Sequence, residues 1–440
     1  MPPPVCAFPA VEGRPAEAVA AVLGGKGAGL LLMTSLGLPV PPGFVITTAA
    51  SSLTPPLREA VAAETDRLAR RTGRTRDGLA VAVRSGAPES MPGMLETVLG
   101  VPLRDGRDGL DHLYRAIEAV WESWHGAPAR AYRRLRRLDE RTGTAVVVQA
   151  MVDGTAHGLS GTGVLFTRDP ATGEPGVTGE FLLGARGPEL VGGTRTPGPL
   201  AVLAAADPVL YRQLTAAAGG LEAALADMCE IEFTVESGRL WLLQVRAGKR
   251  TAVAARRIAL DLADLGLITR PEAVRRGFAP MPEHPETAIA SSAGATLCRG
   301  LPGSPGAAVG RIALDLAAAE RLADAGHDVI LVRRTTDAAD IAAMALSAGV
   351  LTAAGGTTSH AAVVARELGV PCVCGASDLE IDTDRRTVRL PGRELAEGSV
   401  ISIDGTHAIV AEGAQPVSAE SGTRDLACRR RLAEWAETEF

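Results

Sequence analysis

The sequence predicts a multidomain protein of mixed α/β and α+β class. Its 440 residues are enough for two to three domains of ~100–200 residues each. Apolar residues make up 46% and charged residues 22%, the usual balance of a soluble globular chain. Strand-like and helix-like patterns alternate over residues 296–413, which is typical of an α/β layer domain.

The first 250 residues are expected to form one domain, whose elements follow from apolar periodicity and turn residues. Helices are expected at 28–36, 56–76, 107–140 (a pair) and 221–226. Strands are expected at 44–48, 79–84 and 144–152, and residues 85–100 are expected to form a loop. Residues 153–174 have the glycines of a mobile loop, then a strand and a turn. Two alternating strands flank a Ser-Gly turn in 231–246, which indicates a hairpin.

The second half is expected to divide into three parts. Residues 251–295 form a helical linker, in which 251–276 is helical and the polar, Pro-containing stretch 279–295 connects to the next domain. A second domain covers 296–413. The tail, 414–440, is a polar spacer followed by a final helix.

Charge and composition exclude several classes of protein. A net charge of −6 and a pI near 5.8 argue against nucleic-acid binding, which needs a basic footprint. The N-terminus has no basic or apolar signal region, and the longest uncharged stretch, 341–365, is interrupted by glycines, so we expect no membrane segment. Six cysteines are too sparse for a disulfide framework and indicate a reducing, cytoplasmic location. Cys372 and Cys374 are expected to be buried thiols rather than metal ligands.

Two lysines, Lys26 and Lys249, remain among 45 basic residues, and the chain has no asparagine. This drift is typical of a GC-rich genome in which arginine has replaced lysine wherever it serves. Both lysines lie in glycine-flanked turns, at 24–29 and 247–250. A compact ammonium fits where a planar guanidinium does not. Function is therefore one explanation for their retention, and chance survival of a surface lysine is the other.

The segment GGTTSHAAVVAREL (355–368) contains the strongest chemical motif. His360 opens a predicted helix that Gly369 ends, and the positive end of the helix dipole disfavours the imidazolium. Neutral imidazole is a nucleophile. The free N–H groups of the first turn, with the hydroxyls of Thr358 and Ser359, can hold a phosphoryl group. His360 is thus a candidate nucleophile; the alternative is a histidine that only packs at a helix start.

This motif resembles the phosphohistidine signature of the PEP-utilising enzymes, and most of all that of pyruvate phosphate dikinase. Further segments resemble the same family in the same order: 24–48, 83–100, 160–174, 193–197, 227–252 and 300–312. The resemblance covers nearly the whole chain. It implies an ATP-grasp-type nucleotide-binding domain at 1–250 and a swivelling α/β phosphohistidine domain at 296–413. It also implies ATP as substrate and Mg²⁺ as cofactor.

The resemblance assigns roles to individual residues. Lys26 and Arg84 match phosphate-contacting residues. Glu232 and Gln244 match the acidic and amide residues that hold metal and nucleotide, and Arg246 matches a γ-phosphate contact. Taken alone, Glu232 and Arg246 are equally well explained as a cross-strand ion pair.

Other residues complete the expected ATP site. Glu230 lies two residues before Glu232 on the same strand face and joins the acidic patch. Gln149 is expected among the ATP-binding residues. Gly161 and Gly163, with the preceding loop, are expected to close over the phosphates.

Three basic side chains are left outside this set. For Lys249 a structural bridge to the linker and a phosphate contact stay open. His157 is expected to be a solvated loop histidine, and His407 a surface hairpin histidine.

The chain also departs from the family's pattern. The family continues with a β/α barrel for pyruvate or PEP, and this chain is expected to lack it. The insert between residues 100 and 144 is short. In the segment 183–193, Arg186 stands at a glutamine position and Pro188 at an acidic one, while Glu189 substitutes for the second acid. Nucleotide affinity or base contacts are expected to be altered there.

The expected function is ATP-dependent autophosphorylation of His360 with AMP formation, orthophosphate being favoured over water as co-substrate. The phosphoryl group would pass to an acceptor, most simply pyruvate through a separate barrel chain. One alternative is an AMP-forming phosphotransferase for another small molecule, although 251–300 looks too short for its extra domain. Another alternative is a nucleotide-sensing regulatory module without catalysis. A monomer or weak dimer is expected.

Overall fold

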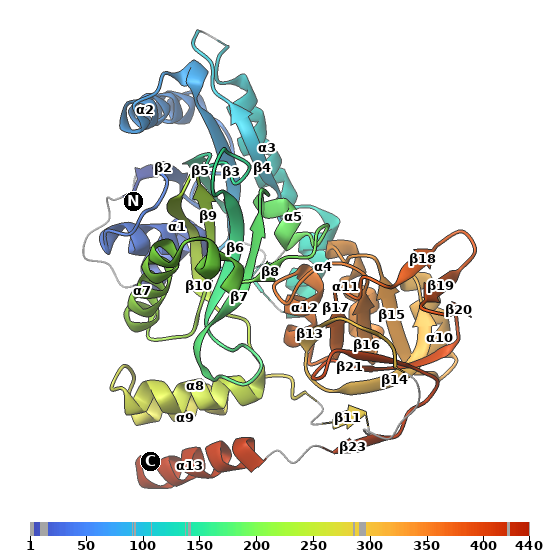
Figure 1. Ribbon diagram of the computed structural model, residues 1–440. Helices are drawn as coiled ribbons and strands as arrows, with labels where there is room; N and C mark the ends of the chain where they lie inside the picture. Colours follow the sequence, from blue (N-terminus) through green and yellow to red (C-terminus); the bar gives the residue numbers. More distant parts are fainter. Residues whose placement is uncertain are drawn as a thin grey trace. The chain divides into compact units, whose positions relative to one another are not determined.

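A computed structural model describes residues 4–8, 16–89, 91, 94–106, 108–136, 138–139, 142–284, 287–289, 296–419 and 423–439 (Figure 1). The chain divides into two compact units. Unit 1 comprises Met1–Ser160 and Ile231–Arg246, and unit 2 comprises Gly161–Glu230 and Ala247–Phe440. The predicted mixed α/β multidomain class is confirmed, whereas the domain limits at 250, 295 and 413 stay a prediction.

Unit 1 contains a five-stranded antiparallel sheet in the order β1-β2-β5-β3-β4. Its strands are β1 (Val5–Ala7), β2 (Gly43–Ile46), β3 (Ala80–Gly86), β4 (Thr97–Pro102) and β5 (Ala145–Ala150). Alternate residues of the central strands, such as Val83 and Val148, form a core with α2 (Pro55–Thr72) and α3 (Asp111–Trp124). Because successive side chains alternate between faces, Arg84 and Gln149 project from the opposite face.

That opposite face is covered by α1 (Ala16–Ser35), which lies against β3 and β5. The helix is kinked at Gly24, whose φ is +68° and whose Cβ, if present, would lie 1.6 Å from the Gly86 carbonyl oxygen. Only glycine fits there. The helix predicted at 28–36 therefore begins earlier, and the kink brings Lys26 into the first turn of its second segment.

The rest of unit 1 comprises α4 (Ala127–Arg136), η1 (Arg76–Gly78) and most of the predicted hairpin, which is formed by β9 (Cys229–Glu236) and β10 (Arg239–Ala247). The pair of helices expected at 107–140 is confirmed by α3 and α4. The loop expected at 85–100 is wrong in part, because β4 begins within it and pairs with β3. Residues 90, 92 and 93 of that loop lie outside the described residues.

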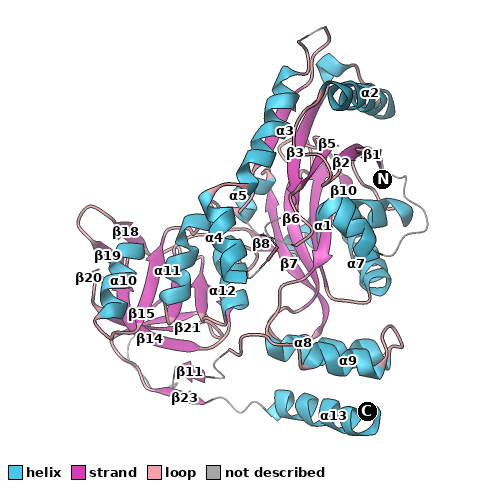
Figure 2. Cartoon of the chain, turned by 180° about the vertical axis from the view of Figure 1, so that it is seen from behind, coloured by secondary structure: helices cyan, strands magenta, loops and turns pink. Residues whose placement is uncertain are grey.

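Unit 2 begins with the antiparallel strands β6 (Gly161–Arg168), β7 (Pro175–Leu183) and β8 (Gly198–Pro199). Its first helices are α5 (Gly187–Val191), α6 (Ala201–Ala206) and α7 (Pro208–Leu225). Then α8 (Ala252–Asp264) and α9 (Arg270–Gly277) pack with the final helix, α13 (Thr423–Glu439), around a small apolar cluster that includes Leu432 and Trp435 (Figure 2).

The larger sheet of unit 2 has eight strands in the order β12-β22-β21-β14-β15-β16-β17-β13. Neighbours from β14 to β17 are parallel, and the remaining pairs are antiparallel. The strands are β12 (Thr296–Arg299), β13 (Leu301–Ser304), β14 (Ala307–Ala313), β15 (Val329–Arg333), β16 (Gly349–Thr352), β17 (Cys372–Cys374), β21 (Val400–Asp404) and β22 (Ile409–Glu412). Between them come α10 (Leu316–Asp324), η2 (Ala338–Asp340), α11 (Ile341–Leu346) and α12 (His360–Leu368). The predicted alternation of strands and helices is confirmed.

Two smaller strand groups complete unit 2. A three-stranded sheet is formed by β18 (Glu380–Asp382), β19 (Thr387–Leu390) and β20 (Arg393–Ala396). The segments that lead into and out of the large sheet pair with each other through β11 (Thr287–Ile289) and β23 (Val417–Ala419). The sequence predicts neither strand, since both fall in polar stretches. Within the predicted linker 279–295, residues 285–286 and 290–295 lie outside the described part.

Candidate functional site

In unit 1, one sheet face and the hairpin bring together a cluster of charged side chains. Arg84, on β3, donates from Nη2 to Glu232 Oε2 at 2.7 Å and to Gln244 Oε1 at 3.1 Å. Its Nη1 donates to the Leu243 carbonyl at 2.9 Å. Glu232 and Gln244 therefore lie side by side on the hairpin, as predicted, and Glu232 is joined by Arg84 to the sheet.

The charges of this cluster strongly perturb one another. Burial, together with the Arg84 and Arg246 cations, lowers the pKa of Lys26 to about 7, although Glu232 opposes the shift. Burial alone would raise the pKa of Glu232, but Arg84, Arg246 and Lys26 together hold it below its ordinary value. Three cationic side chains thus surround one carboxylate. Such a surplus of positive charge in a partly buried site favours an anionic ligand such as a polyphosphate.

The same side chains meet the requirements of a magnesium site. Mg²⁺ prefers oxygen ligands and is commonly held by one or two protein groups together with phosphate oxygens. Glu232 and Gln244 present a carboxylate and an amide oxygen to one cation, the Arg84 guanidinium, which stands in for a metal. The donor set therefore fits Mg²⁺ in the presence of a nucleotide. Within the described part of the chain, no group of three His, Cys, Asp or Glu residues could hold a metal by itself.

Gln149 is buried on β5, where its amide nitrogen donates to the Pro41 carbonyl at 3.0 Å. It shares a sheet face with Arg84 on the neighbouring strand. Its predicted role as an ATP-binding residue is compatible with that position and stays a prediction.

The glycines predicted to close over the phosphates lie in a strand, and their role in ATP binding stays a prediction. Gly161 and Gly163 belong to β6 and pair with Leu183 and Phe181 of β7, so their assignment to a loop is wrong. A Cβ at Gly161 would lie 2.6 Å from the Phe181 ring, which explains the glycine by packing.

Glu230 is buried in unit 2. The charge of its carboxylate partly offsets the lowering of the Arg366 pKa by burial.

A second set of side chains surrounds His360 in unit 2. Ser359 is the N-cap of α12, so His360 is the first helical residue, as predicted. The imidazole is buried, and its Nδ1 lies 3.1 Å from the Thr336 hydroxyl oxygen. Its Nε2 has no hydrogen-bond partner among the described residues. Nδ1 is therefore fixed by its contact with Thr336, and Nε2 is left without a partner among those residues.

Burial lowers the pKa of His360 despite the opposing charges of Asp337, Asp340 and Glu367. The predicted neutral imidazole is thus favoured, chiefly by desolvation. When Nδ1 carries the proton and donates a hydrogen bond to the Thr336 hydroxyl oxygen, Nε2 holds the free lone pair. A neutral ring with an unpaired lone pair on Nε2 is the form in which histidine acts as a nucleophile.

The turn before His360 is a cradle of hydrogen-bond donors for an anion. Glu180 of β7 places its carboxylate there and accepts bonds from the backbone N–H groups of Thr357 (2.6 Å) and Thr358 (3.1 Å). It also accepts from their hydroxyls, at 3.0 and 2.6 Å. A Cβ at Gly356 would lie 2.3 Å from both carboxylate oxygens, so the glycine is required for this contact. The cradle therefore binds an anion through four donors, and the Ser359 hydroxyl has no partner within the described residues.

Sequence reasoning missed Thr336 and Glu180. Thr336 lies 24 residues before His360, just ahead of η2, and Glu180 lies more than 170 residues before the cradle. The Asp337 capping box marks the start of η2 and could have located Thr336 at a helix entry. No local pattern identifies Glu180.

The remaining singled-out residues have structural positions. His157 is exposed in a turn, and His407 lies in the β21–β22 turn with its Nδ1 3.1 Å from Asp404, so both predictions are confirmed. Cys372 and Cys374 are fully buried free thiols, also as predicted. Lys249 forms an ion pair with Glu367 of α12 at 2.5 Å.

The segment that departs from the family's pattern forms the short helix α5. Glu189 accepts a hydrogen bond from the Arg186 backbone N–H at 2.9 Å and pairs with Arg195 at 3.1 Å. These contacts lower the pKa of Glu189. Its carboxylate is thus engaged by its own helix start, and its predicted substitution for a family acid stays a prediction.

Comparison with known proteins finds two family models that match segments of the chain. The model for "Pyruvate phosphate dikinase, AMP/ATP-binding domain" matches residues 49–218, and that for "PEP-utilising enzyme, mobile domain" matches residues 325–408. Pyruvate, phosphate dikinases from Clostridium symbiosum and Rhizobium meliloti are 35% and 36% identical over 89% and 94% of this chain, which covers 56% and 58% of their lengths. The chloroplastic enzyme of Flaveria trinervia is 35% identical over 92% of this chain and 53% of its own.

Among solved structures, D-alanine-D-alanine ligase from Helicobacter pylori overlaps 51% of this chain and 54% of its own, at 13% identity and a TM-score of 0.27. In the described part of the chain, no helix combines the length and apolar character needed to cross a bilayer. Two segments of the chain thus match models of the PEP-utilising enzymes, and the chain is similar to the pyruvate, phosphate dikinases, of which it spans about half the length.

Proposed function

We propose that this chain catalyses the ATP-dependent phosphorylation of His360 on Nε2, with AMP as the nucleotide product. The observation that carries the proposal is the buried Nε2 of His360, which has no hydrogen-bond partner among the described residues, while Nδ1 of the same ring contacts Thr336. The anion cradle at Thr357 and Thr358 and the cationic cluster around Glu232 support it independently. A histidine, a phosphoryl cradle and a polyphosphate site are the parts that this chemistry needs.

The residues of unit 1 bind and orient the nucleotide in this proposal. Lys26, Arg84 and Arg246 contact the phosphates and neutralise the charge that develops on them. Glu232 and Gln244 would hold Mg²⁺, which when bound would offset the charge of the phosphates. In this proposal, Arg84 gives up its hydrogen bonds to the Glu232 and Gln244 side-chain oxygens and binds phosphate oxygens instead.

The residues of unit 2 supply the nucleophile. The lone pair of Nε2 forms a bond to the β-phosphorus while the bond from that phosphorus to the α–β bridging oxygen breaks, and AMP leaves with the electron pair. Orthophosphate then takes the terminal phosphoryl group as pyrophosphate and leaves phosphohistidine. Thr336 keeps the Nδ1 proton in place throughout. The Thr357–Thr358 cradle receives the phosphoryl oxygens once Glu180 releases it.

The phosphoryl group then passes to an acceptor. Because the matched relatives are named for pyruvate and phosphate, we propose pyruvate, bound on a barrel outside these 440 residues, as the final acceptor. A cytoplasmic location, and a monomer or weak dimer, stay predictions.

The test is incubation with MgATP, with and without orthophosphate, followed by nucleotide chromatography and intact mass. AMP together with an acid-labile adduct is expected in the wild type and in His407→Ala, a control at an exposed histidine, and neither product in His360→Ala. Dependence on orthophosphate separates the dikinase reaction from one in which water is the co-substrate. ADP as the product would refute the AMP-forming mechanism.

One alternative keeps the binding site without catalysis. The altered segment at Arg186 and Pro188 favours a nucleotide-sensing module. ATP binding without any adduct would support it.

A further inference from the structure

The second lysine of the chain is not used by the proposed reaction. Lys249 follows β10, the strand that contains Gln244 and Arg246, by two residues. Its ammonium lies 2.5 Å from Glu367 Oε1, and the two side chains are only 24% and 10% exposed. Screening by solvent is weaker for such a pair than for a surface pair.

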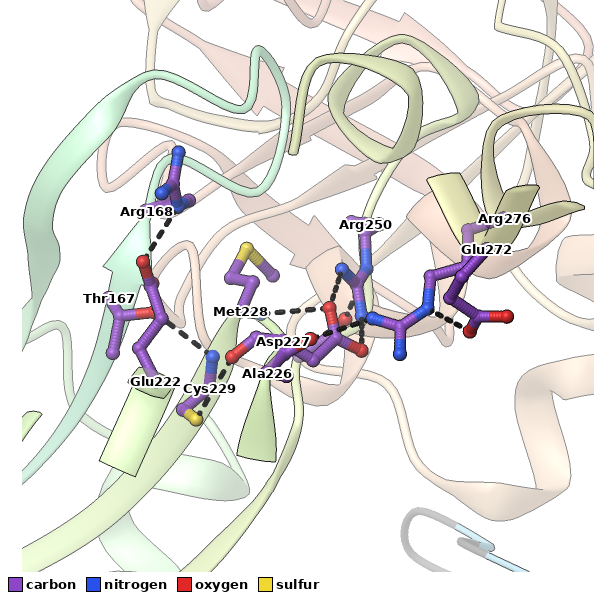
Figure 3. A network of polar contacts seen from close by, with 11 residues as sticks. Thr167, Arg168, Glu222, Ala226, Asp227, Met228, Cys229, Arg250, Glu272 and Arg276 are labelled. Atoms are coloured by element: carbon purple, nitrogen blue, oxygen red, sulfur yellow. Dashed lines mark hydrogen bonds and ion pairs between the residues drawn. The ribbon is translucent and has the colours of Figure 1, made fainter. Parts of the chain in front are cut away.

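The turn that contains Lys249 is held on both sides. Before it, the Gly248 N–H donates to the Met228 carbonyl at 2.9 Å. After it, Arg250 forms a two-point ion pair with Asp227 at 2.5 and 2.7 Å (Figure 3). Arg276 supports the same corner by donating to the Ala226 carbonyl at 2.7 Å. Lys249 therefore projects from a fixed base.

That base is in turn fixed to the strands and helices around it. Thr167 of β6 accepts from the Cys229 N–H at 3.0 Å and donates to Glu222 of α7. Arg168 joins Glu222 to Asp261 of α8, at 2.9 and 2.7 Å. Figure 3 shows the part of this network that leads from Thr167 to Arg276. A rigid support of this kind suits a side chain whose role is to position a neighbouring element.

The partner, Glu367, belongs to the helix that begins at His360. Seven residues separate the two along α12, which is two turns or ~10 Å of helix. Arg366, the preceding residue, is buried and donates to the carbonyls of Gly303 at 2.5 Å and Thr357 at 3.0 Å. The last turns of α12 are thus held from two directions, by Arg366 toward β13 and by Lys249 toward the end of β10.

We propose that Lys249 is a positioning residue, which holds α12 through Glu367 so that His360 is presented for phosphorylation. The inference rests on the proposed function for its kinetic consequence, but the restraint on α12 can be measured without it. A lysine suits the role because a compact ammonium makes a single close contact with a nearly buried carboxylate. The retention of lysine here, in a chain that otherwise uses arginine, is then explained.

The test compares Lys249→Met, Glu367→Gln and the charge-exchanged double variant, Lys249→Glu with Glu367→Lys. The control is Arg431→Met, which breaks an exposed ion pair with Asp264 in the same unit. Hydrogen exchange of the α12 amides is measured without nucleotide. Phosphorylation is then measured at saturating ATP. Both single variants are expected to exchange about tenfold faster in α12 and to lose about tenfold in kcat, since small misplacement of a reacting group is costly.

The KM for ATP is expected to stay unchanged, because Lys249 does not contact the nucleotide in this account. The double variant is expected to recover both readouts, which a general packing defect would not allow. Unchanged exchange in both single variants, or failure of the double variant to recover, would overturn the inference. If the wild type is never phosphorylated, the proposed function fails, while the exchange data still decide whether the ion pair restrains α12.

Discussion

The unusual titration of Lys26 leads to a prediction about nucleotide affinity. In the free protein, burial and the Arg84 and Arg246 cations bring the pKa of Lys26 to about 7. A bound triphosphate places negative charge beside the ammonium and raises that pKa again. Binding therefore takes up a proton in the pH range between the free-state and the bound-state pKa, and affinity must fall as pH rises through that range, because the free protein has to be protonated first.

The size of the effect follows from the free-state pKa. With that pKa at about 7, the protonated fraction of the free protein falls about 50-fold between pH 7 and pH 9, while the bound form stays protonated when its pKa is raised beyond this range. The dissociation constant for MgATP should rise by the same factor. With excess Mg²⁺, the charge of the nucleotide itself is constant over this range.

Isothermal calorimetry at pH 7, 8 and 9 measures the affinity, and buffers of different ionisation enthalpy measure the proton uptake. Lys26→Arg is the matched control, because a guanidinium stays charged and should give an affinity independent of pH. A flat profile for the wild type, or the same slope in Lys26→Arg, would refute the reasoning.

Three further outcomes are expected. Thr336→Val should slow phosphorylation about fivefold, the equivalent of one lost hydrogen bond of ~1 kcal/mol, without changing the KM for ATP in steady-state kinetics; an unchanged rate would remove Thr336 from the mechanism. His284, whose pKa burial and a neighbouring guanidinium lower to about 4, binds its proton only in the unfolded chain between pH 6.5 and 4, so the native state loses about 2 kcal/mol by pH 5. In His284→Leu, urea titrations at pH 7 and 5 should show that loss abolished, and an equal loss in both proteins would contradict the assignment. Gly356→Ala should expel Glu180 from its four hydrogen bonds and cost ~1–3 kcal/mol in urea unfolding, whereas Gly219→Ala, at an open helical position, should not destabilise; equal stability of the two variants would count against the contact.

The sequence predicts elements whose signals are local. His360 at the start of α12 follows from a cap, an apolar run and a terminating Gly369, all within one short segment. The β9–β10 hairpin follows from alternation around Ser237 and Gly238, and its geometry brings Glu232 beside Gln244. In both cases the local pattern contains the signals that fix the residue's position, whereas its contacts with Thr336 or Arg84 come from elsewhere in the chain.

Features that depend on distant contacts could not be predicted in this way. Gly161 and Gly163 indicate a loop by composition, but both pair within a strand, and a Cβ at Gly161 would meet the Phe181 ring and the Leu182 carbonyl. The pairing of β11 with β23 joins segments more than 120 residues apart, and each segment alone is too short and polar to indicate a strand. The contact between Glu180 and the cradle is of the same kind, since nothing near either end signals the other.

The assignment of Nε2 as the phosphorylated atom is the central claim, and its most direct test is the site of attachment on the ring. The protein labelled with ¹⁵N-histidine is incubated with MgATP and orthophosphate, and the phosphorylated product is examined by ¹H–¹⁵N and ³¹P NMR under alkaline conditions. The account predicts a single phosphohistidine, absent in His360→Ala, with phosphorus on Nε2 and the proton retained on Nδ1. Phosphorus on Nδ1, or on any residue other than His360, would contradict it.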